Sequence, residues 1–489
     1  MSNRLHIPLH RLRRAVRSLI GLPALLALAL CQACGSDDTA GTAATAGEYY
    51  LSLNITVSTG TATRATRAPR AASGPSGGEE GDGREEGTAA ENRVTGVTIF
   101  LFEGQGINAP DASAVTVHAF YWPVTRDETV PGTRAVTYTT GSRLLDKRIK
   151  SGHYHLLAVA NTDRSDLDGK MLSEVRDAIY DRTPFTPTTA TAVAAGTDFV
   201  MASAADAEIM IGPVQGGHAG TEQDPYQPGT ITDGGYADKD VDVERLAARI
   251  DFDTDGSTGF TESATDGDGY VYSVIDVAAG QATGETFVLT AVVPFNLAMP
   301  SWLFKRVAAP EAVSAVSWLG DENPASGVQT NYVVGLYFGD KATSPFPHAG
   351  FYVPAYRRAT LDAALTAGHQ VPKGSGTFVV AYTAENTFPA AVQQSETLMG
   401  DAATGLRFIG YIRDADGNKT EDRSYDYYLR HSAPTGTAAD DAVMKYGVVR
   451  NNIYSVRISR VTGTQMDFGI RLELRVVPWL KYTHPGLIM

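Results

Sequence analysis

The sequence predicts an all-β protein built from β-sandwich domains with little helix. Apolar residues occur in short runs or in strict alternation with polar residues, and clusters rich in Gly, Asp and Pro separate these runs. The 49 glycines, the 22 tyrosines and the abundant Thr, Val and Ala favour strands and turns over helices. Only one short helix is expected, around residues 171–179. Strands joined by irregular loops are typical of β-sandwiches.

The first 33 residues have the organisation of a lipoprotein signal peptide. Five arginines and no acidic residue precede the apolar stretch Leu19–Leu30. As a helix this stretch would be roughly 18 Å long, against a hydrocarbon core of about 30 Å, so it is too short for a permanent membrane anchor. The segment that follows resembles a bacterial lipobox. Ala33 before Cys34 predicts cleavage between these two residues and lipidation, palmitate included, of Cys34.

The lipid and the residues after it predict the location of the chain. Several acyl chains on Cys34, at about 0.8 kcal/mol per buried methylene, would hold the protein stably on a membrane. Ser36, Asp37 and Asp38 resemble acidic export signals that follow lipid cysteines. We therefore expect the outer membrane first and the extracellular surface afterwards. The alternative is an ordinary cleaved signal in which Cys34 has no role.

Cysteine content and charge exclude several classes of protein. Both cysteines lie near the signal, so neither a disulfide framework nor a thiolate metal site is expected. Removing five arginines and no acidic residue with the signal moves the net charge from −14 to −19. Such an acidic chain is a poor partner for nucleic acid. No cofactor is expected.

An isolated strand and a linker follow the lipid. Residues 51–58 alternate strictly between apolar and polar side chains, which predicts a half-buried strand. Residues 61–92 are rich in Gly, Glu and Thr and predict a flexible linker. Arg64, Arg67 and Arg70 lie in that linker. Two interpretations stay open: an exposed linker that many proteases can cut, and a dedicated cleavage that frees the first strand.

The rest of the chain predicts two units of domain size that meet near residue 240. Strands are expected at 94–102, 154–161, 286–294, 331–338, 377–383, 406–412, 425–430 and 452–461. Turn clusters are expected at 215–240, 253–269 and 414–422. The clearest amphipathic strand lies almost at the C-terminus, where apolar residues alternate with charged residues and glycine from 466 to 476.

The sequence contains only weak motifs for metal binding or catalysis. Residues 251–262 match the spacing of an EF-hand calcium loop, but no helix follows, so we expect an acidic surface turn. His153 and His155 alternate on a predicted strand without identifiable further ligands, so no metal site is predicted. The G-x-S-x-G pattern at residues 74–78 lies in the linker and lacks the strand and helix of a nucleophile elbow. No catalytic residues are predicted, and we expect that the chain is not an enzyme.

Several segments together resemble the Bacteroidales-type fimbrillins, the subunits of type V pili. Each segment is short, and their order and spacing carry the resemblance. They are Arg93–Phe102, Gly152–Asn161, Val243–Asp251, Tyr382–Thr387, Val449–Tyr454 and Leu474–Trp479.

The resemblance implies a fold and a division of the chain. Fimbrillins have two tandem transthyretin-like β-sandwich domains behind a lipoprotein signal and a linker. Carried onto this sequence, the parts are a signal peptide at 1–33, a lipidated propeptide strand with the Arg/Gly-rich linker at 34–92, and domains at 93–240 and 241–489. The segment 243–250 becomes a strand that opens the second domain.

The resemblance also implies a mechanism of assembly. An arginine-specific protease would cut after Arg64, Arg67 or Arg70 and release the strand at 49–58. A C-terminal strand from another subunit, within residues 465–489, would fill the groove left behind. Its core-facing residues would be Phe468, Ile470, Leu472, Leu474 and Val476. The partners are thus other fimbrial subunits, in a homopolymer, together with the protease and the outer membrane, and the product is an adhesive surface fimbria.

One further function stays open from the residues alone. A surface lipoprotein could bind glycans by stacking sugars on Trp122, Trp302 and Trp318. Such a protein would gain nothing from cleavage at the linker arginines. Tryptophans at strand ends are more often part of a core.

Overall fold

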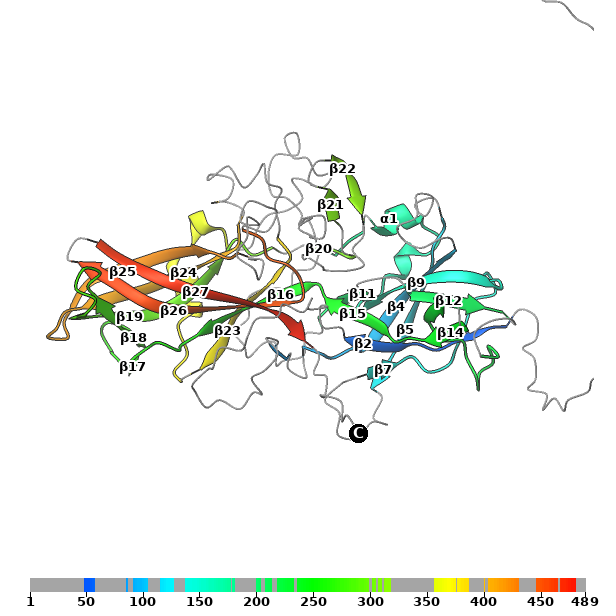
Figure 1. Ribbon diagram of the computed structural model, residues 1–489, viewed down its shortest axis with the longest axis horizontal. Coiled ribbons are helices and arrows are strands. Elements are labelled where there is room, and N and C mark those ends of the chain that lie inside the picture. The colour runs from blue at the N-terminus through cyan, green and yellow to red at the C-terminus, as the bar shows by residue number, and fades with distance from the viewer. Residues whose placement is uncertain are drawn as a thin grey trace, which may run out of the picture. The chain divides into compact units, whose positions relative to one another are not determined.

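The computed structural model describes the parts of the chain that form secondary structure and their connections (Figure 1). These parts lie in one compact unit, Ala43–Met489. The described residues are 48–57, 85–86, 91–103, 115–126, 137–176, 178–180, 199–203, 207–212, 218–232, 235–298, 301–304, 307–309, 312–317, 356–374, 376–386, 400, 403–430, 446–464 and 467–480.

The described chain is nearly all β, as the sequence predicts. The helices are α1 (Leu172–Arg176), α3 (Ala363–Gly368) and 3₁₀ turns at 165–167 and 358–360. None of the described helices has the length and apolar character needed to cross a bilayer. The expected strand at 331–338 lies outside the described residues.

Eleven strands form the first sheet, in which β9 is central. β9 pairs with β4 along one edge and with β12 and then β11 along the other. The order runs β14-β13-β12-β9-β11-β15-β2-β7-β6, and β5 pairs with β4. The bounds are β2 Asn54–Val57, β4 Gly96–Glu103, β5 His118–Pro123, β6 Thr125–Arg126, β7 Thr137–Thr139, β9 Gly152–Ala160, β11 Met201–Ser203, β12 Ala207–Ile211, β13 Gly229–Thr232, β14 Gly235–Asp238 and β15 Val241–Arg245.

Ten strands form the second sheet, in the order β23-β16-β26-β18-β19-β24-β25. β17 pairs with β18, β27 with β26, and β3 with β27. The bounds are β3 Glu85–Glu86, β16 Ala247–Asp253, β17 Gly259–Thr261, β18 Gly269–Ile275, β19 Ala282–Phe295, β23 Thr377–Ala384, β24 Gly405–Arg413, β25 Lys419–Tyr428, β26 Asn452–Thr464 and β27 Asp467–Leu480.

Three two-stranded pairings complete the described strands. β1 pairs with β8, β10 with β20 and β21 with β22. Their bounds are β1 Tyr50–Leu51, β8 Arg143–Leu144, β10 Ile179–Tyr180, β20 Ser301–Trp302, β21 Val307–Ala309 and β22 Ala312–Ser317.

The central strands of the first sheet are apolar on both faces because both faces are covered. Along β4, Ile99 and Leu101 pack into one buried cluster, whereas Phe100 and Phe102 pack into another. The side chains of neighbouring strand residues point to opposite faces, which explains the unbroken apolar run. A third cluster fills the second sheet and includes Phe252, Phe287 and Phe408.

Three expected turn segments contain strands. β13 and β14 form a hairpin within 215–240, β17 lies within 253–269, and β25 begins within 414–422. These strands are polar or rich in glycine. Because a neighbouring strand supplies their main-chain hydrogen bonds, they need no apolar side chains to form.

The chain passes from the first sheet to the second at Leu246. β15 pairs with β11 and β2 in the first sheet, and β16 pairs with β23 and β26 in the second. This passage lies a few residues beyond the division at 240 that the sequence indicates. The expected strand at 243–250 is therefore shared between β15 and β16.

Buried arginines surround this passage. The Arg245 side chain donates from Nε to the backbone oxygen of Glu91 at 3.0 Å and from Nη1 to Asn451 Oδ1 at 3.1 Å. Arg249 donates to the Glu91 carboxylate at 3.2 Å, and Tyr382 donates its hydroxyl to the same carboxylate at 2.7 Å. Burial lowers the pKa of Arg245 to about 9, so it stays protonated at neutral pH. One carboxylate thus joins groups from β16 and β23.

A second buried ion pair joins Arg450 and Glu385, whose side chains have no exposed surface. Arg450 Nε donates to Glu385 Oε2 at 2.7 Å, and Nη2 donates to the backbone oxygen of Trp302 at 2.6 Å. The guanidinium therefore ties the end of β20 to the second sheet.

We predict that Glu385→Gln destabilises the protein by about 3–5 kcal/mol, because it leaves the buried Arg450 charge uncompensated. Urea unfolding followed by circular dichroism measures the free energy of unfolding. Glu421→Gln is the control: its carboxylate pairs with Arg423 at the surface, so the cost is below about 1 kcal/mol. Equal effects of the two substitutions would contradict the prediction.

Candidate functional site

The first described segment, residues 48–57, is held along its whole length by main-chain hydrogen bonds. β1 pairs with β8, and the Leu145 amide donates to the Tyr49 oxygen at 2.8 Å. β2 then lies between β15, to which it is parallel, and β7, to which it is antiparallel (Figure 1). β2 thus occupies an internal position of the first sheet, while β1 pairs outside it with β8.

The same segment contributes apolar side chains to the core. Leu51, Leu53 and Ile55 have no exposed surface and belong to the main cluster of the first sheet. Ile55 lies opposite Val241 on one side and Tyr138 on the other. If this segment left, three fully buried aliphatic side chains would leave with it and an apolar groove would open between β7 and β15.

A loop at residues 218–226 also holds β1. The Tyr50 amide donates to the Gly220 oxygen at 3.0 Å, and the Tyr226 amide donates to the Tyr50 oxygen at 2.8 Å. The Ser52 amide donates to the Tyr226 oxygen at 2.9 Å. This loop therefore forms a short parallel bridge with the chain at Leu51.

His218 stabilises the conformation of this loop through contacts with two carboxylates. One ring nitrogen lies 2.7 Å from Asp224 Oδ1, and the other lies 3.1 Å from the Asp238 carboxylate. Burial by itself would lower the pKa of His218, but hydrogen bonds to the two carboxylates outweigh it and raise the pKa above its ordinary value. The bond to His218 also lowers the pKa of Asp224.

The C-terminal strand β27 is held differently. It pairs with β26 over nearly its full length, while within the described residues its other edge meets only β3, at Trp479 and Leu480. Ile470, Leu472 and Leu474 are half-buried against the second core, whereas Arg471 and Glu473 are exposed. The expected alternation is therefore present from 470 to 474.

The first segment and β27 differ in how deeply their apolar side chains are buried. This difference is relevant to an exchange of strands between chains. The apolar residues of the first segment are fully buried between two neighbours. In β27, Ile470, Leu472 and Leu474 are only half-buried, and the strand lies at the edge of its sheet. An edge strand of alternating pattern is a template or donor for pairing with another chain.

The predicted site residues fall in different parts of the chain. Phe468 and Val476 lie in β27, where their backbones pair with Gly463 and Tyr454. The signal cleavage and lipidation residues Ala33 and Cys34 lie outside the described residues, and so do Arg64, Arg67 and Arg70. They stay predictions.

The tryptophans of the glycan alternative do not form a common surface in the described chain. Trp302 is 4% exposed and belongs to the first core. Trp122 packs partly buried against that core and stacks on Phe120, with ring centroids 6.1 Å apart. Trp318 lies outside the described residues.

The EF-hand pattern does not form an acidic surface turn throughout, because its first residue is buried. Asp251 lies in β16, is 1% exposed and accepts a hydrogen bond from Arg249 Nη2 at 2.8 Å. At the other end, Glu262 pairs with Lys373. The first carboxylate of the pattern is therefore engaged by an arginine, and the expectation is wrong for Asp251.

The tertiary structure brings together one group that sequence spacing missed. His153 and His155 on β9 lie beside Glu208 on β12. More than fifty residues separate the carboxylate from the histidines, so no local pattern links them.

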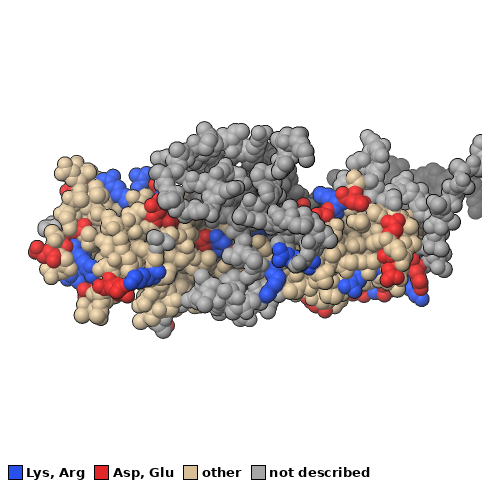
Figure 2. Space-filling view, turned by 90° about the horizontal axis from the view of Figure 1, so that it is seen from below, with Lys and Arg blue, Asp and Glu red and all other residues tan. Residues whose placement is uncertain are grey.

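Charge on the visible surface is mixed. On the described part of the face in Figure 2, acidic and basic side chains lie interspersed. Among the ion pairs of exposed side chains, Arg457 pairs with both Glu473 and Asp255.

Comparison with solved structures returns distant similarities. The tip fimbrial protein Mfa3 from Porphyromonas gingivalis is 12% identical, with a TM-score of 0.40; the match covers 88% of this chain and 100% of that one. A protein from Bacteroides eggerthii described as a candidate cell adhesion protein is 12% identical, with a TM-score of 0.37, over 90% and 98% of the two chains. Similarity at this level carries no argument about function. No curated protein sequence matches the chain.

Comparison with family models gives one match, which covers part of the chain. Residues 50–233 match the model of the major fimbrial subunit protein (FimA). The match begins at β1 and ends just after β13, and so includes the segment that fills the first sheet. The family is one of structural fimbrial subunits and not of enzymes. The resemblance stated from the sequence is thus confirmed by this match, which makes residues 50–233 of the chain similar to the major fimbrial subunit protein (FimA) family.

Proposed function

We propose that this chain is a fimbrial subunit that is exported as a lipoprotein, trimmed after an arginine of the linker and polymerised by donor-strand exchange. One observation carries the proposal. β2 fills an internal position of the first sheet, yet a linker with three arginines follows it in the chain. A strand with this connection can be cut off from the sheet that it completes.

The proposal assigns the parts of the chain as follows. Residues 1–33 are the signal, cleaved between Ala33 and Cys34, and Cys34 carries the lipid that anchors the subunit in the outer membrane before processing. Residues 34–92 are the lipidated propeptide strand and the linker. Two tandem sandwich domains follow, and the passage at Leu246 supports their separation between the two sheets.

Removal of residues 49–58 would leave β7 and β15 without their common neighbour. The three aliphatic side chains buried there contribute about 5–9 kcal/mol of gross hydrophobic stabilisation. An incoming strand with alternating apolar residues restores both the main-chain ladders and this burial. Five or six apolar side chains would contribute on the order of 10 kcal/mol gross. This is enough to hold a fibre where no energy source maintains assembly.

The donor in this proposal is the C-terminal segment 465–489 of another copy, with β27 at its centre. Phe468, Ile470, Leu472, Leu474 and Val476 enter the groove, and the alternate residues face solvent. Because a subunit with both a groove and a donor can extend in two directions, the chain is a shaft subunit of an adhesive surface homopolymer.

The first prediction concerns cleavage. Limited digestion of the purified chain with an arginine-specific protease should produce a ladder of polymers on a gel of unboiled samples, because cleavage opens the groove. Boiling should collapse the ladder to one band. A variant with Arg64, Arg67 and Arg70 all changed to Ala should stay monomeric.

Two outcomes decide this experiment. Cleavage without a ladder would contradict polymerisation and would indicate a tip or anchor subunit or a monomeric binder. A ladder in the variant without the three arginines would contradict the role of these arginines.

The second prediction concerns the donor face. Leu472→Asp should abolish the ladder after normal cleavage, because a carboxylate would enter an apolar groove without a partner. Arg471→Asp, on the exposed face of the same strand, should assemble as the unchanged chain does. Circular dichroism of both uncut variants checks that the monomer is folded. Ladders of equal length in the two variants would rule out β27 as the donor.

The third prediction concerns pH and the loop at 218–226. Because the folded pKa of His218 is raised, its stabilising effect is complete below the ordinary histidine pKa of about 6.5 and is lost as the pH rises through the folded value. Hydrogen exchange of the Tyr50, Ser52 and Tyr226 amides, corrected for intrinsic rates, should show less protection at about pH 9 than at about pH 6. His218→Asn should remove this difference, and its persistence would contradict the role of His218.

A further inference from the structure

Two histidines and one glutamate lie on one face of the first sheet. His153 and His155 are two residues apart on β9, so their side chains point to the same side. On the neighbouring strand β12, Glu208 lies directly opposite His155, and Met210 lies opposite His153. The carboxylate is therefore the cross-strand neighbour of one imidazole and the diagonal neighbour of the other.

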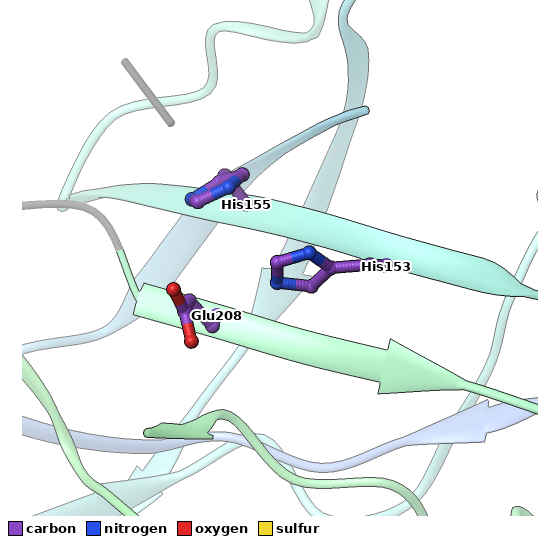
Figure 3. A group of neighbouring side chains, drawn as sticks. All are labelled: His153, His155 and Glu208. Atoms are coloured by element: carbon purple, nitrogen blue, oxygen red, sulfur yellow. The ribbon is translucent and has the colours of Figure 1, made fainter. Parts of the chain in front are cut away.

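The side chains face one another (Figure 3). One ligand atom from each residue lies within 4.8 Å of the other two. The two imidazole rings have centroids 5.0 Å apart and are tilted by 49°. The rings are thus not stacked on each other, and each can present a nitrogen toward the Glu208 carboxylate.

The surroundings hold the group in place. His155 is 5% exposed and stacks on Phe102 of β4, with ring centroids 5.6 Å apart and planes 23° apart. The His153 Nε2 atom is buried and has no hydrogen-bond partner among the described residues. A buried polar atom without a partner is costly, and a bound cation would satisfy it.

We propose that His153, His155 and Glu208 bind a divalent first-row transition-metal ion, with zinc as the representative. Two imidazoles and one carboxylate are a ligand set that such ions accept, with water in the fourth position. Bonds of about 2.0–2.2 Å would place the ligand atoms roughly 3.3 Å apart, so they must converge by at most about 1.5 Å. The convergence would come from rotation of the half-buried side chains of His153 and Glu208 toward the fixed ring of His155.

The bound ion would have a structural role. It would link β9, the centre of the first sheet, to β12, which carries the outer hairpin of β13 and β14. The site lies apart from the groove of β2 and does not depend on the proposed strand exchange. Zinc binding and polymerisation can therefore be tested separately.

The test is calorimetric titration of the full chain, without a histidine tag and freed of metal, with zinc chloride in a buffer that does not chelate metal. We expect one saturable site per chain. At a hundredfold excess over Kd the melting temperature should rise by roughly 5–10 °C.

Three variants locate the site. Glu208→Gln and His153→Asn should each weaken zinc binding at least about tenfold and reduce the melting shift, because each removes one ligand. Both residues are half-buried, so these changes preserve the core. His369→Asn is the control: this ring packs edge-to-face against Tyr356 beside the second sheet, and its loss should leave zinc affinity unchanged.

Clear results would overturn the proposal. Absence of saturable binding by the folded full chain would do so. So would unchanged affinity in both Glu208→Gln and His153→Asn, or an equal loss in His369→Asn, since the zinc would then bind elsewhere.

Discussion

Arg245 and Arg249, on either side of the passage between the two sheets, share one partner, Glu91. Arg245 binds the backbone oxygen of Glu91, and Arg249 binds its carboxylate, which also accepts the hydroxyl of Tyr382. Charges this deeply buried are tolerated only when they are paired and hydrogen-bonded. The arrangement therefore fixes the C-terminal end of the linker, where Glu91 lies. Both sheets depend on these contacts, which join three segments that are distant in sequence: Glu91, the passage with Arg245 and Arg249, and Tyr382.

The fixed position of Glu91 determines what a cut in the linker would leave attached to the first sheet. The sheet that β2 completes is anchored to the C-terminal end of the linker through Glu91, while β2 itself is held by the linker and by its neighbours in the sheet. A cut in the linker would leave the second anchor intact and the first strand held by non-covalent contacts alone. Strand removal is then a local event that does not need the core of the second sheet to open. At the opposite end of the chain, β27 pairs mainly with one strand and buries its apolar face only partly. The same chain thus combines a tightly buried strand, whose removal we propose, with an edge strand that is held less tightly.

Much of the fold follows from local pattern. The alternation at 470–474, the apolar runs in β4 and β9, and the short helix near 172–176 all match their predictions, because periodicity reports which faces are covered. Polar strands were missed where pairing, and not side-chain burial, forms them, as in β13, β14 and β17. Spacing also misled at Asp251, whose pattern suits a surface turn but whose strand position and Arg249 bury it. The group of His153, His155 and Glu208 could not be found from spacing, since strand register alone brings Glu208 to the histidines.

The sequence by itself determined the class of fold, the family resemblance and the residues proposed for export, cleavage and donation, since these depend on composition and on short-range pattern. The tertiary structure alone decided that β2, residues 54–57, occupies an internal position of the first sheet. It also decided that the chain changes sheets at Leu246 and that buried arginines secure this passage. The reason is physical: periodicity records whether a side chain is covered, whereas pairing between distant strands decides which element covers it.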